Sequence, residues 1–194
     1  VVPVRVMSKV YTLCYLVQAQ LDSLGEKAEK STQQAFEKMF VYAMIWAFGG
    51  PLPSDKVCDH RKNFSRAWVD TFKDVILPLK EDMTVFDLYY DCEDDQWDGW
   101  DVLVPEYTPP NELNFSSVVV QTCETTALSH AVKLLSSTGR PVMLVGAAGS
   151  GKTTVLQDFL ANLGSNWMNN DIAMNYYTDS KSFQAQLEGP IDKR

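Results

Sequence analysis

The chain has 194 residues, 45% of them hydrophobic and 22% charged, which is the balance of a folded protein with one or two domains and not of a disordered segment. Its formal net charge is -8 at pH 7 and its lysines and arginines are scattered, so we expect neither a nucleic acid nor a membrane as a partner. No apolar run approaches the roughly 18 residues of a membrane span, and the four cysteines include no Cys-x-x-Cys pair, which favours free thiols in the cytoplasm.

The N-terminal part is predicted to form three helices, because its apolar residues recur at spacings of three and four. The first helix covers residues 4–24. Ser31 or Thr32 supplies the N-cap of the second, which should end at Gly49-Gly50 with a left-handed glycine. The third covers residues 59–76. The residues expected to face the core are Met7, Val10, Cys14, Val17, Leu21 and Leu24 in the first helix, Phe36, Met39, Phe40, Ala43 and Ala47 in the second, and Phe64, Trp68, Phe72 and Val75 in the third.

A β-hairpin is predicted next, because the sequence becomes rich in β-branched and aromatic residues on both sides of an acidic turn. Its strands are expected within residues 85–90 and 97–104, and the turn at residues 91–95. A calcium loop is disfavoured, because Gln96 stands where such a loop needs glycine and Val102 where it needs a bidentate glutamate. A solvated acidic turn is the preferred interpretation.

Residues 105–110 contain three prolines and are predicted to be a stiff linker, after which strands and helices alternate as in an α/β domain. His60 and His130 are interpreted as surface residues of helices, since neither has a nearby partner for catalysis or metal binding. The elements expected after the linker are a short strand or loop at 114–120, a helix at 124–135, a buried strand at 141–145, a helix at 154–160, a strand at 174–178 and the start of a helix at 180–187.

Residues 146–153 read Gly-Ala-Ala-Gly-Ser-Gly-Lys-Thr and match the phosphate-binding pattern G-x-x-x-x-G-K-[ST] at all four fixed positions. Glycines let the backbone fold tightly around phosphate, whose charge meets the N–H groups of the loop and of the helix N-terminus. Lys152 is expected to reach the β- and γ-phosphates, and the Thr153 hydroxyl to be a Mg²⁺ ligand. The sequence therefore predicts a site for ATP or ADP with Mg²⁺ made by Gly146, Ala147, Ala148, Gly149, Ser150, Gly151, Lys152, Thr153 and Thr154.

Hydrolysis needs in addition an acidic residue at the end of another strand and usually an arginine. No apolar strand ending in an acidic pair lies between Thr153 and Arg194, and Asp179 and Asp171 do not stand at the end of a suitable strand. We therefore expect no catalytic residue in this chain, weak ATP binding and no turnover when the chain is taken alone. Residues 107–194 are also expected to fold poorly by themselves, because they hold few strands that could pair.

Several segments together resemble the heavy chains of axonemal dyneins. Residues 141–153 resemble the Walker A segment of the third AAA+ module of that family, and residues 175–178 and 187–191 are similar to the stretch that follows it. Residues 41–50, Val-Tyr-Ala-Met-Ile-Trp-Ala-Phe-Gly-Gly, are similar to the helix that closes the second module. A Walker A motif alone would not separate dynein from other ATPases, whereas this helix followed by a hairpin does.

The resemblance implies a fold of the class α plus α/β. Residues 1–82 would be the helical AAA+ lid of the preceding module, residues 83–106 a β-hairpin and linker, and residues 107–194 the truncated N-terminal part of a P-loop AAA+ module. Val119 would contribute to nucleotide binding, because it lies in the stretch that usually receives adenine in this family. Asp179 departs from the family, which often has a second threonine there.

The resemblance also implies a function. The parent protein would be an ATPase and an ATP-driven microtubule motor of the cytoskeleton, working in the cytoplasm and in the axoneme of cilia or flagella. This segment would supply the ATP-binding loop of a regulatory ring module. Microtubules would be bound by parts outside this chain, and other dynein chains would be partners. Two alternatives remain open at this point: a structural ring module that holds a static nucleotide, and another multi-module AAA+ ATPase, such as a ribosome-maturation ring.

Overall fold

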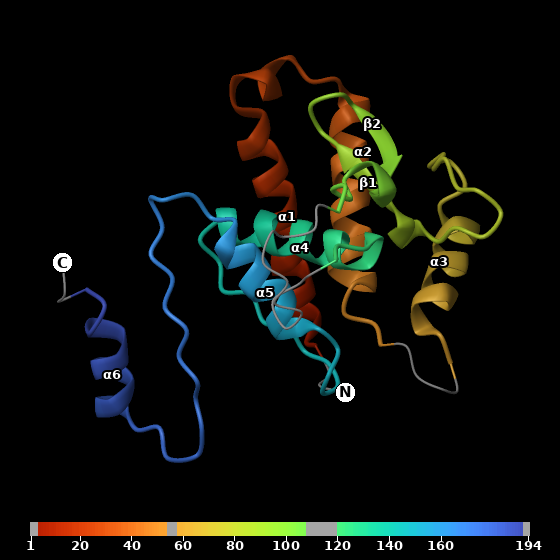
Figure 1. Ribbon diagram of the computed structural model, residues 1–194. Coiled ribbons are helices and arrows are strands. Elements are labelled where there is room, and N and C mark those ends of the chain that lie inside the picture. Colours follow the sequence, from red (N-terminus) through yellow and green to blue (C-terminus); the bar gives the residue numbers. More distant parts are fainter. Residues whose placement is uncertain (1–3, 54–57, 108–119, 192–194) are drawn as a thin grey trace. The chain divides into compact units, whose positions relative to one another are not determined.

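The computed structural model describes residues 4–53, 58–107 and 120–191 (Figure 1). Backbone contacts separate two compact units, Val1–Leu156 and Gln157–Arg194, each of which is considered by itself. The first unit is helical with one small hairpin, and α6 is the one helix that lies wholly within the described residues of the second. The helices are α1 (Val6–Leu24), α2 (Gln33–Met44), α3 (His60–Thr71), α4 (Cys123–Ser137), α5 (Lys152–Ala161) and α6 (Ser180–Glu188), the strands are β1 (Leu88–Asp91) and β2 (Gln96–Gly99), and the short helical turns are η1 (Gly25–Lys30), η2 (Ile45–Gly49), η3 (Val85–Asp87) and η4 (Trp100–Val102).

Side-chain caps set the starts of α2 and α3. The Thr32 hydroxyl accepts a hydrogen bond from the Ala35 N–H at 3.2 Å, and the Asp59 carboxylate accepts one from the Lys62 N–H at 3.0 Å. Each bond satisfies a donor that the first helical turn leaves without an acceptor. The predicted cap of the second helix is therefore confirmed, with Thr32 in the role. α3 ends before its predicted limit, and Phe72, the residue that follows it, packs against the ring of Trp68.

The predicted apolar stripes face the core only in part. Met7 and Val10 in α1 are exposed, whereas Leu16 is fully buried. Leu16 packs with residues of α2, η2 and α4, so the position of these neighbours decides which part of α1 is covered. The spacing of the apolar residues predicts the helix correctly, but it does not tell which part of the helix its neighbours cover. The prediction was also wrong for Cys14, Phe36, Phe40 and Phe72, which are exposed.

Gly49 and Gly50 end the second helical segment in a π-helical turn, and the left-handed glycine predicted there does not occur. Gly50 has φ -53 and ψ -41, which is right-handed helical backbone. Gly49 is required by close packing instead, because a Cβ at this position would lie 2.5 Å from Cζ of Phe86. A Cβ at Gly50 would meet the carbonyl oxygen of Trp46. The absence of side chains here lets η2 approach η3.

The predicted hairpin is confirmed, with shorter strands than expected. β1 and β2 pair antiparallel, with Tyr89 opposite Asp98. The flanking residues that were predicted as strand form η3 and η4. Thr84 and Asp87 explain the first of these turns, because they make a capping box in which the Thr84 N–H donates to the Asp87 carboxylate at 2.6 Å.

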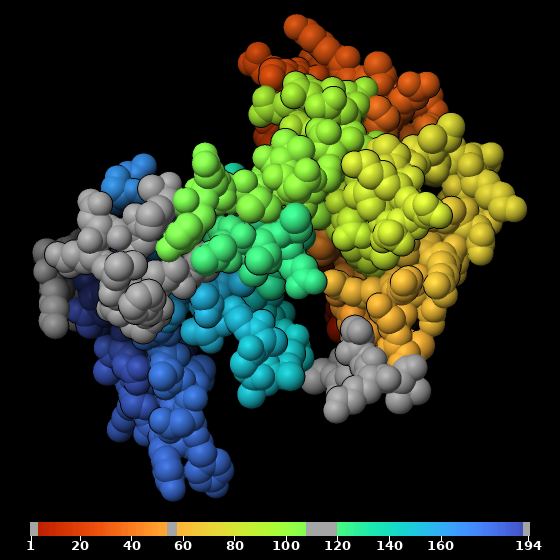
Figure 2. Space-filling view, turned by 45° about the vertical axis from the view of Figure 1, so that its right-hand side comes forward, coloured from red at the N-terminus to blue at the C-terminus, as the bar shows by residue number. Residues whose placement is uncertain are grey.

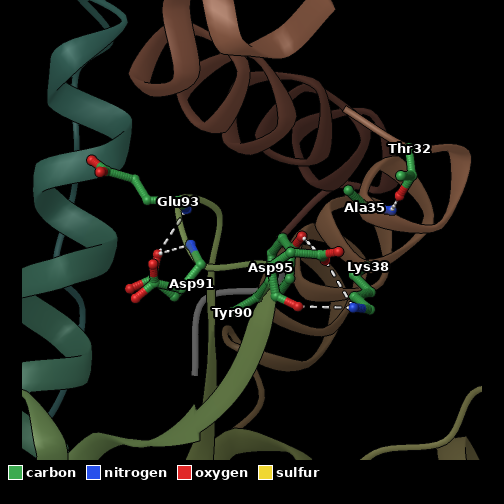
Figure 3. Close-up of polar contacts among 8 residues, drawn as sticks. Thr32, Ala35, Lys38, Tyr90, Asp91, Glu93 and Asp95 are labelled. Atoms are coloured by element: carbon green, nitrogen blue, oxygen red, sulfur yellow. Dashed lines mark hydrogen bonds and ion pairs between the residues drawn. The ribbon is translucent and has the colours of Figure 1, made fainter. Parts of the chain in front are cut away.

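The acidic turn between the strands is attached to α2, as Figure 3 shows. The Lys38 ammonium group donates to the Asp95 carboxylate at 2.8 Å and to the Asp95 carbonyl oxygen at 2.9 Å, and the Tyr90 hydroxyl donates to the same carboxylate at 2.7 Å. These hydrogen bonds, first from Lys38 and then from Tyr90, hold the pKa of the Asp95 carboxyl below its usual value. The Asp91 carboxylate accepts a hydrogen bond from the Glu93 N–H at 2.8 Å. The turn therefore uses its carboxylates to fold and to bind α2.

Aromatic rings join the hairpin to the helices around it. The Trp100 ring centroid lies 5.9 Å from that of Trp46, 5.2 Å from Tyr89 and 5.4 Å from His130. The Trp100 indole N–H donates to the Phe86 carbonyl oxygen at 2.8 Å, so its polar atom is satisfied although the side chain is buried. Figure 2 shows this arrangement from the surface, with the green hairpin residues between N-terminal residues in red and orange and the turquoise residues of α4.

The strands predicted in the last part of the chain do not form, whereas the three helices predicted there are confirmed as α4, α5 and α6. Residues 141–145 carry no strand pairing, and Met143 and Val145 are 78% and 61% exposed. Residues 174–178 are irregular. A strand is stabilised by hydrogen bonds to a neighbouring strand, and β1 and β2 form the one sheet within the described residues. The segment predicted at 114–120 falls outside those residues except for Val120.

Ser65 shows how α3 is fastened to the hairpin and provides a test of it. Its hydroxyl accepts a hydrogen bond from the Val85 N–H at 3.0 Å, and both residues are buried. We expect Ser65→Ala to reduce the free energy of unfolding by about 1–3 kcal/mol, because the Val85 N–H would remain buried without an acceptor. Urea unfolding measures this loss, with Ser8→Ala on the exposed start of α1 as the control. Equal stability of the two variants would show that this bond contributes nothing.

Candidate nucleotide-binding site

The predicted phosphate-binding loop lies between the extended segment 141–145 and α5, which begins at Lys152. The Val155 N–H donates to the Gly151 carbonyl oxygen at 2.9 Å and closes the first turn of the helix. The Val155 side chain is buried, so this first turn is packed against the protein. The N–H groups in the first turn of a helix have no acceptor within the helix, so this end of α5 can donate hydrogen bonds to an anion.

Two glycines give the loop its curvature. Gly149 has φ 75 and Gly151 has φ 77, which is the left-handed region that strains residues with a Cβ. Gly146 is restricted in a different way, because a Cβ there would lie 3.1 Å from Ser150 Oγ and 3.7 Å from Lys152 Cδ. A side chain at any of these three positions would therefore strain the loop or enlarge it. This backbone suits a phosphate group, which needs N–H donors on a concave surface without Cβ atoms in the way.

The Lys152 ammonium group joins the two ends of the loop. It donates to the carbonyl oxygens of Gly146 and Ala147 at 3.1 Å and 2.6 Å and to the Ser150 hydroxyl at 3.0 Å. All these acceptors are neutral, and a phosphate oxygen is a stronger acceptor because it is charged. Lys152 can therefore exchange these bonds for bonds to phosphate with little movement of the backbone. The residues present fit a nucleotide phosphate.

The structure brings the predicted residues 146–154 into one loop and helix start. Thr153 and Thr154 lie in the first turn of α5 and are exposed. Val119, predicted beside the adenine, lies outside the described residues. Among the described residues, no group of three or more His, Cys, Asp or Glu side chains could hold a metal ion. No helix in the described ranges is both long and apolar enough to cross a membrane.

Asp179 has a structural role that our sequence analysis missed. It is the N-cap of α6, where its carboxylate accepts a hydrogen bond from the Ser182 N–H at 2.8 Å. Hydrogen bonds from Ser182, first from its backbone N–H and then from its side chain, lower the pKa of the Asp179 carboxyl. The sequence Asp-Ser-Lys-Ser at residues 179–182 contains this cap signal, because Asp179 and Ser182 have the spacing of a capping box. Asp179 therefore starts a helix, which agrees with its exclusion as a metal ligand.

Arg140 is a residue beside the site that sequence reasoning did not identify. Its guanidinium carbon lies 4.2 Å from the centre of the Tyr15 ring in α1, within the range of a cation–π interaction. Arg140 immediately precedes the segment that leads to the phosphate-binding loop. A contact across 125 positions leaves no signal in local spacing, since Arg140 and Tyr15 each look like ordinary surface residues in the sequence.

The interpretation of both histidines as surface residues was wrong for His130. His60 is exposed, whereas His130 is half-buried. The His130 ring lies 6.3 Å from Tyr42, 6.2 Å from Tyr89 and 5.4 Å from Trp100. Burial disfavours the charged imidazolium and lowers the His130 pKa to about 4. The helix α4 thus meets the N-terminal helices and the hairpin through a neutral histidine. Helical spacing could have indicated this, since the apolar residues Ala127 and Leu134 lie three positions before and four positions after His130.

A glycine loop closed by a lysine at the start of a helix is the P-loop motif, so the chain belongs to the class of P-loop containing proteins. Comparison with protein families gives the particular family. Residues 1–102 match the dynein heavy chain AAA lid domain, and residues 107–194 match the P-loop containing dynein motor region. The chain belongs to the dynein heavy chain family.

Curated relatives match this chain along its whole length. It is 39% identical over 194 residues to the ciliary dynein beta chain of Heliocidaris crassispina and 35% identical over 195 residues to dynein axonemal heavy chain 9 of Homo sapiens. It is 33% identical over 196 residues to the dynein alpha chain of the flagellar outer arm of Chlamydomonas reinhardtii. Each match covers 100% of this chain and 4% of the relative, so the chain spans a small part of the length of these relatives.

Proposed function

We propose that residues 146–154 bind ATP or ADP with Mg²⁺ in a regulatory ring module of an axonemal dynein heavy chain. The carrying observation is the loop itself, in which Lys152 contacts both ends and Gly149 and Gly151 adopt the left-handed backbone that a phosphate cradle needs. Family membership supports the same assignment, since the matching family region is a P-loop containing motor region.

Each residue of the loop has a role in this proposal. The N–H groups of the loop and of the first turn of α5 donate to the phosphates, and Lys152 donates its charge to the β- and γ-phosphates. Thr153 is the Mg²⁺ ligand among these residues, Thr154 lies near the α-phosphate, and Val119 contacts the adenine. When bound, Mg²⁺ offsets the negative charge of the phosphates. The binding residues are Gly146, Ala147, Ala148, Gly149, Ser150, Gly151, Lys152, Thr153, Thr154 and Val119.

The proposed organisation follows the family. Residues 1–82 form the lid of the second AAA+ module, residues 83–106 the hairpin and linker, and residues 107–194 the start of the third module. Support comes from the two family regions, which meet between residues 102 and 107. In the complete ring, an α/β subdomain would offer strand partners to the exposed apolar residues Met143 and Val145.

The proposed parent is an ATPase and an ATP-driven microtubule motor that moves cilia or flagella. The names of the relatives support this, because they are ciliary, axonemal and flagellar dyneins. The cytoskeleton of the axoneme is the proposed location, with microtubules bound elsewhere in the parent and other dynein chains as partners. Family membership sets aside another kind of multi-module AAA+ ATPase. A structural ring module with a static nucleotide remains the alternative, and nucleotide exchange in the intact ring would distinguish it.

The test of nucleotide binding is Lys152→Ala in the 194-residue chain. We expect the affinity for a fluorescent ATP analogue with Mg²⁺ to fall at least about tenfold, because the phosphates lose a direct charge-assisted donor that contributes roughly 1.5–3 kcal/mol. Lys62→Ala, an exposed lysine on α3, is the matched control and should bind like the unchanged chain. Phosphate release by the unchanged chain should not exceed that of Lys152→Ala. Equal binding by the two lysine variants would refute the assigned site.

A further inference from the structure

The last turn of α4 packs against α1, shortly before the segment of the chain that leads to the phosphate-binding loop. Leu134 and Leu135, in the last turn of α4, pack against the buried cluster that contains Leu16 of α1. Gly139 then has φ 69, so the chain turns sharply directly after the helix. Arg140 follows and places its guanidinium over the ring of Tyr15, which directly precedes Leu16 in the sequence. The end of α4 and Arg140 therefore both contact α1 shortly before the loop.

The segment between Arg140 and the loop is attached by side chains and not by backbone pairing, with Val142 and Leu144 half-buried. Within the described residues, no backbone–backbone hydrogen bond involves residues 140–147, and Met143 and Val145 are exposed. The next fixed points are the bonds from Lys152 to Gly146 and Ala147. The direction in which the chain enters the loop is thus set by its two ends, Arg140 on one side and Lys152 on the other.

We infer that Arg140 on Tyr15 is a positioning contact through which the lid helix α1 holds the entrance of the phosphate-binding loop. The two residues fall in different family regions, since Tyr15 belongs to the AAA lid and Arg140 to the P-loop containing region. The contact therefore couples the lid of one module to the nucleotide affinity of the next. This inference rests on the proposed function of the loop.

The expected size of the effect follows from the kind of contact. Arg140 is exposed and Tyr15 is half-buried, so the interaction energy of the contact should be that of a solvent-accessible cation–π pair. Losing it should weaken nucleotide binding about two- to fivefold. Arg140 could also attract the nucleotide directly by its charge, and the variants must separate these two effects.

The experiment is a double-mutant cycle in the 194-residue chain. Tyr15→Leu removes the ring and keeps the charge of Arg140, whereas Arg140→Gln removes the charge and keeps the ring. Tyr15→Phe restores the ring without the hydroxyl. Arg66→Gln, an exposed arginine on α3, is the control for the loss of one positive charge. Each variant is titrated with a fluorescent ATP analogue and Mg²⁺, and its thermal midpoint is measured without nucleotide.

Support requires that Tyr15→Leu and Arg140→Gln each weaken binding about two- to fivefold, that the double variant is no weaker than either one, and that Tyr15→Phe and Arg66→Gln bind normally. Unchanged binding in Tyr15→Leu, or additive losses in the double variant, would overturn the inference. If the unchanged chain binds no better than Lys152→Ala, the proposed function fails and the inference with it. The thermal midpoints show separately whether the two residues interact. A midpoint change in the double variant that differs from the sum of the two single changes would show that the contact exists.

Discussion

Trp100→Ala is expected to lower the free energy of unfolding by about 3–5 kcal/mol, the range measured for large buried aromatic residues. Trp100 is 2% exposed and contacts rings from η2, β1 and α4, so its removal would leave a cavity where three parts of the first unit meet. The substitution would also leave the Phe86 carbonyl oxygen without the indole donor. Urea unfolding followed by circular dichroism measures the loss.

Trp167→Ala is the control for this experiment, because Trp167 is 68% exposed. Its stability should stay within about 0.5 kcal/mol of that of the unchanged chain. Trp100→Phe keeps a ring but not the N–H group and should give an intermediate loss, which separates the cavity from the hydrogen bond. A loss in Trp100→Ala as small as that in Trp167→Ala would mean that the ring cluster does not hold the hairpin to the helices.

Acidification is expected to remove about 3 kcal/mol of stability through His130 as the pH falls from about 6.5 to about 4. The folded state lowers the His130 pKa from 6.5 to about 4, so the unfolded chain takes up the proton first. The contribution of neutral His130 is therefore complete above pH 6.5 and is lost progressively as the pH falls through this window. Each pKa unit corresponds to about 1.4 kcal/mol.

The surroundings of His130 explain the direction of this shift. Burial is the largest cause, Lys133 on the same helix lowers the pKa further, and Asp91 of the hairpin raises it by a smaller amount. The rings of Tyr42 and Tyr89, on α2 and β1, pack around the imidazole and provide no anion near neutral pH. Protonation would therefore place a charge among rings, and the Asp91 carboxylate offsets only part of its cost.

His130→Phe provides the comparison, because it keeps a ring and cannot titrate. The difference in unfolding free energy between the unchanged chain and this variant should change by about 3 kcal/mol between pH 7 and pH 4, whereas the carboxylates that titrate in the same range act on both chains and cancel. His60→Gln should retain the full pH dependence, because His60 is exposed. A pH profile that His130→Phe leaves unchanged would show that the imidazole is not buried in solution.

The features that the sequence predicted best are those with local causes. Thr32 caps α2 because its hydroxyl meets an N–H three residues further on, and the turn between β1 and β2 is closed locally by the hydrogen bond from the Glu93 N–H to Asp91. The phosphate-binding loop is similar, since its glycines and Lys152 interact within seven positions. Short-range hydrogen bonds and backbone preferences can be inferred from the order of the residues alone.

The features that the sequence did not predict depend on contacts between distant segments. His130 is half-buried because the hairpin rings lie against α4, and Arg140 has a partner because Tyr15 of α1 is within reach. Gly49 appeared to be a helix terminator, but the Phe86 ring explains it. Residues 141–145 have the composition of a buried strand, yet composition does not supply the neighbouring strand that hydrogen bonding requires. Such contacts have to be observed in three dimensions.

The two attachments of the hairpin have a mechanical consequence. Lys38 binds its tip to α2, and at its base the Trp100 ring packs against Trp46 of η2 and His130 of α4. A two-stranded ribbon held only at its base could swing as a flexible arm, but one held at both ends cannot. A tilt of α2 would therefore carry the tip of the hairpin with it and act on the rings around His130 at the base.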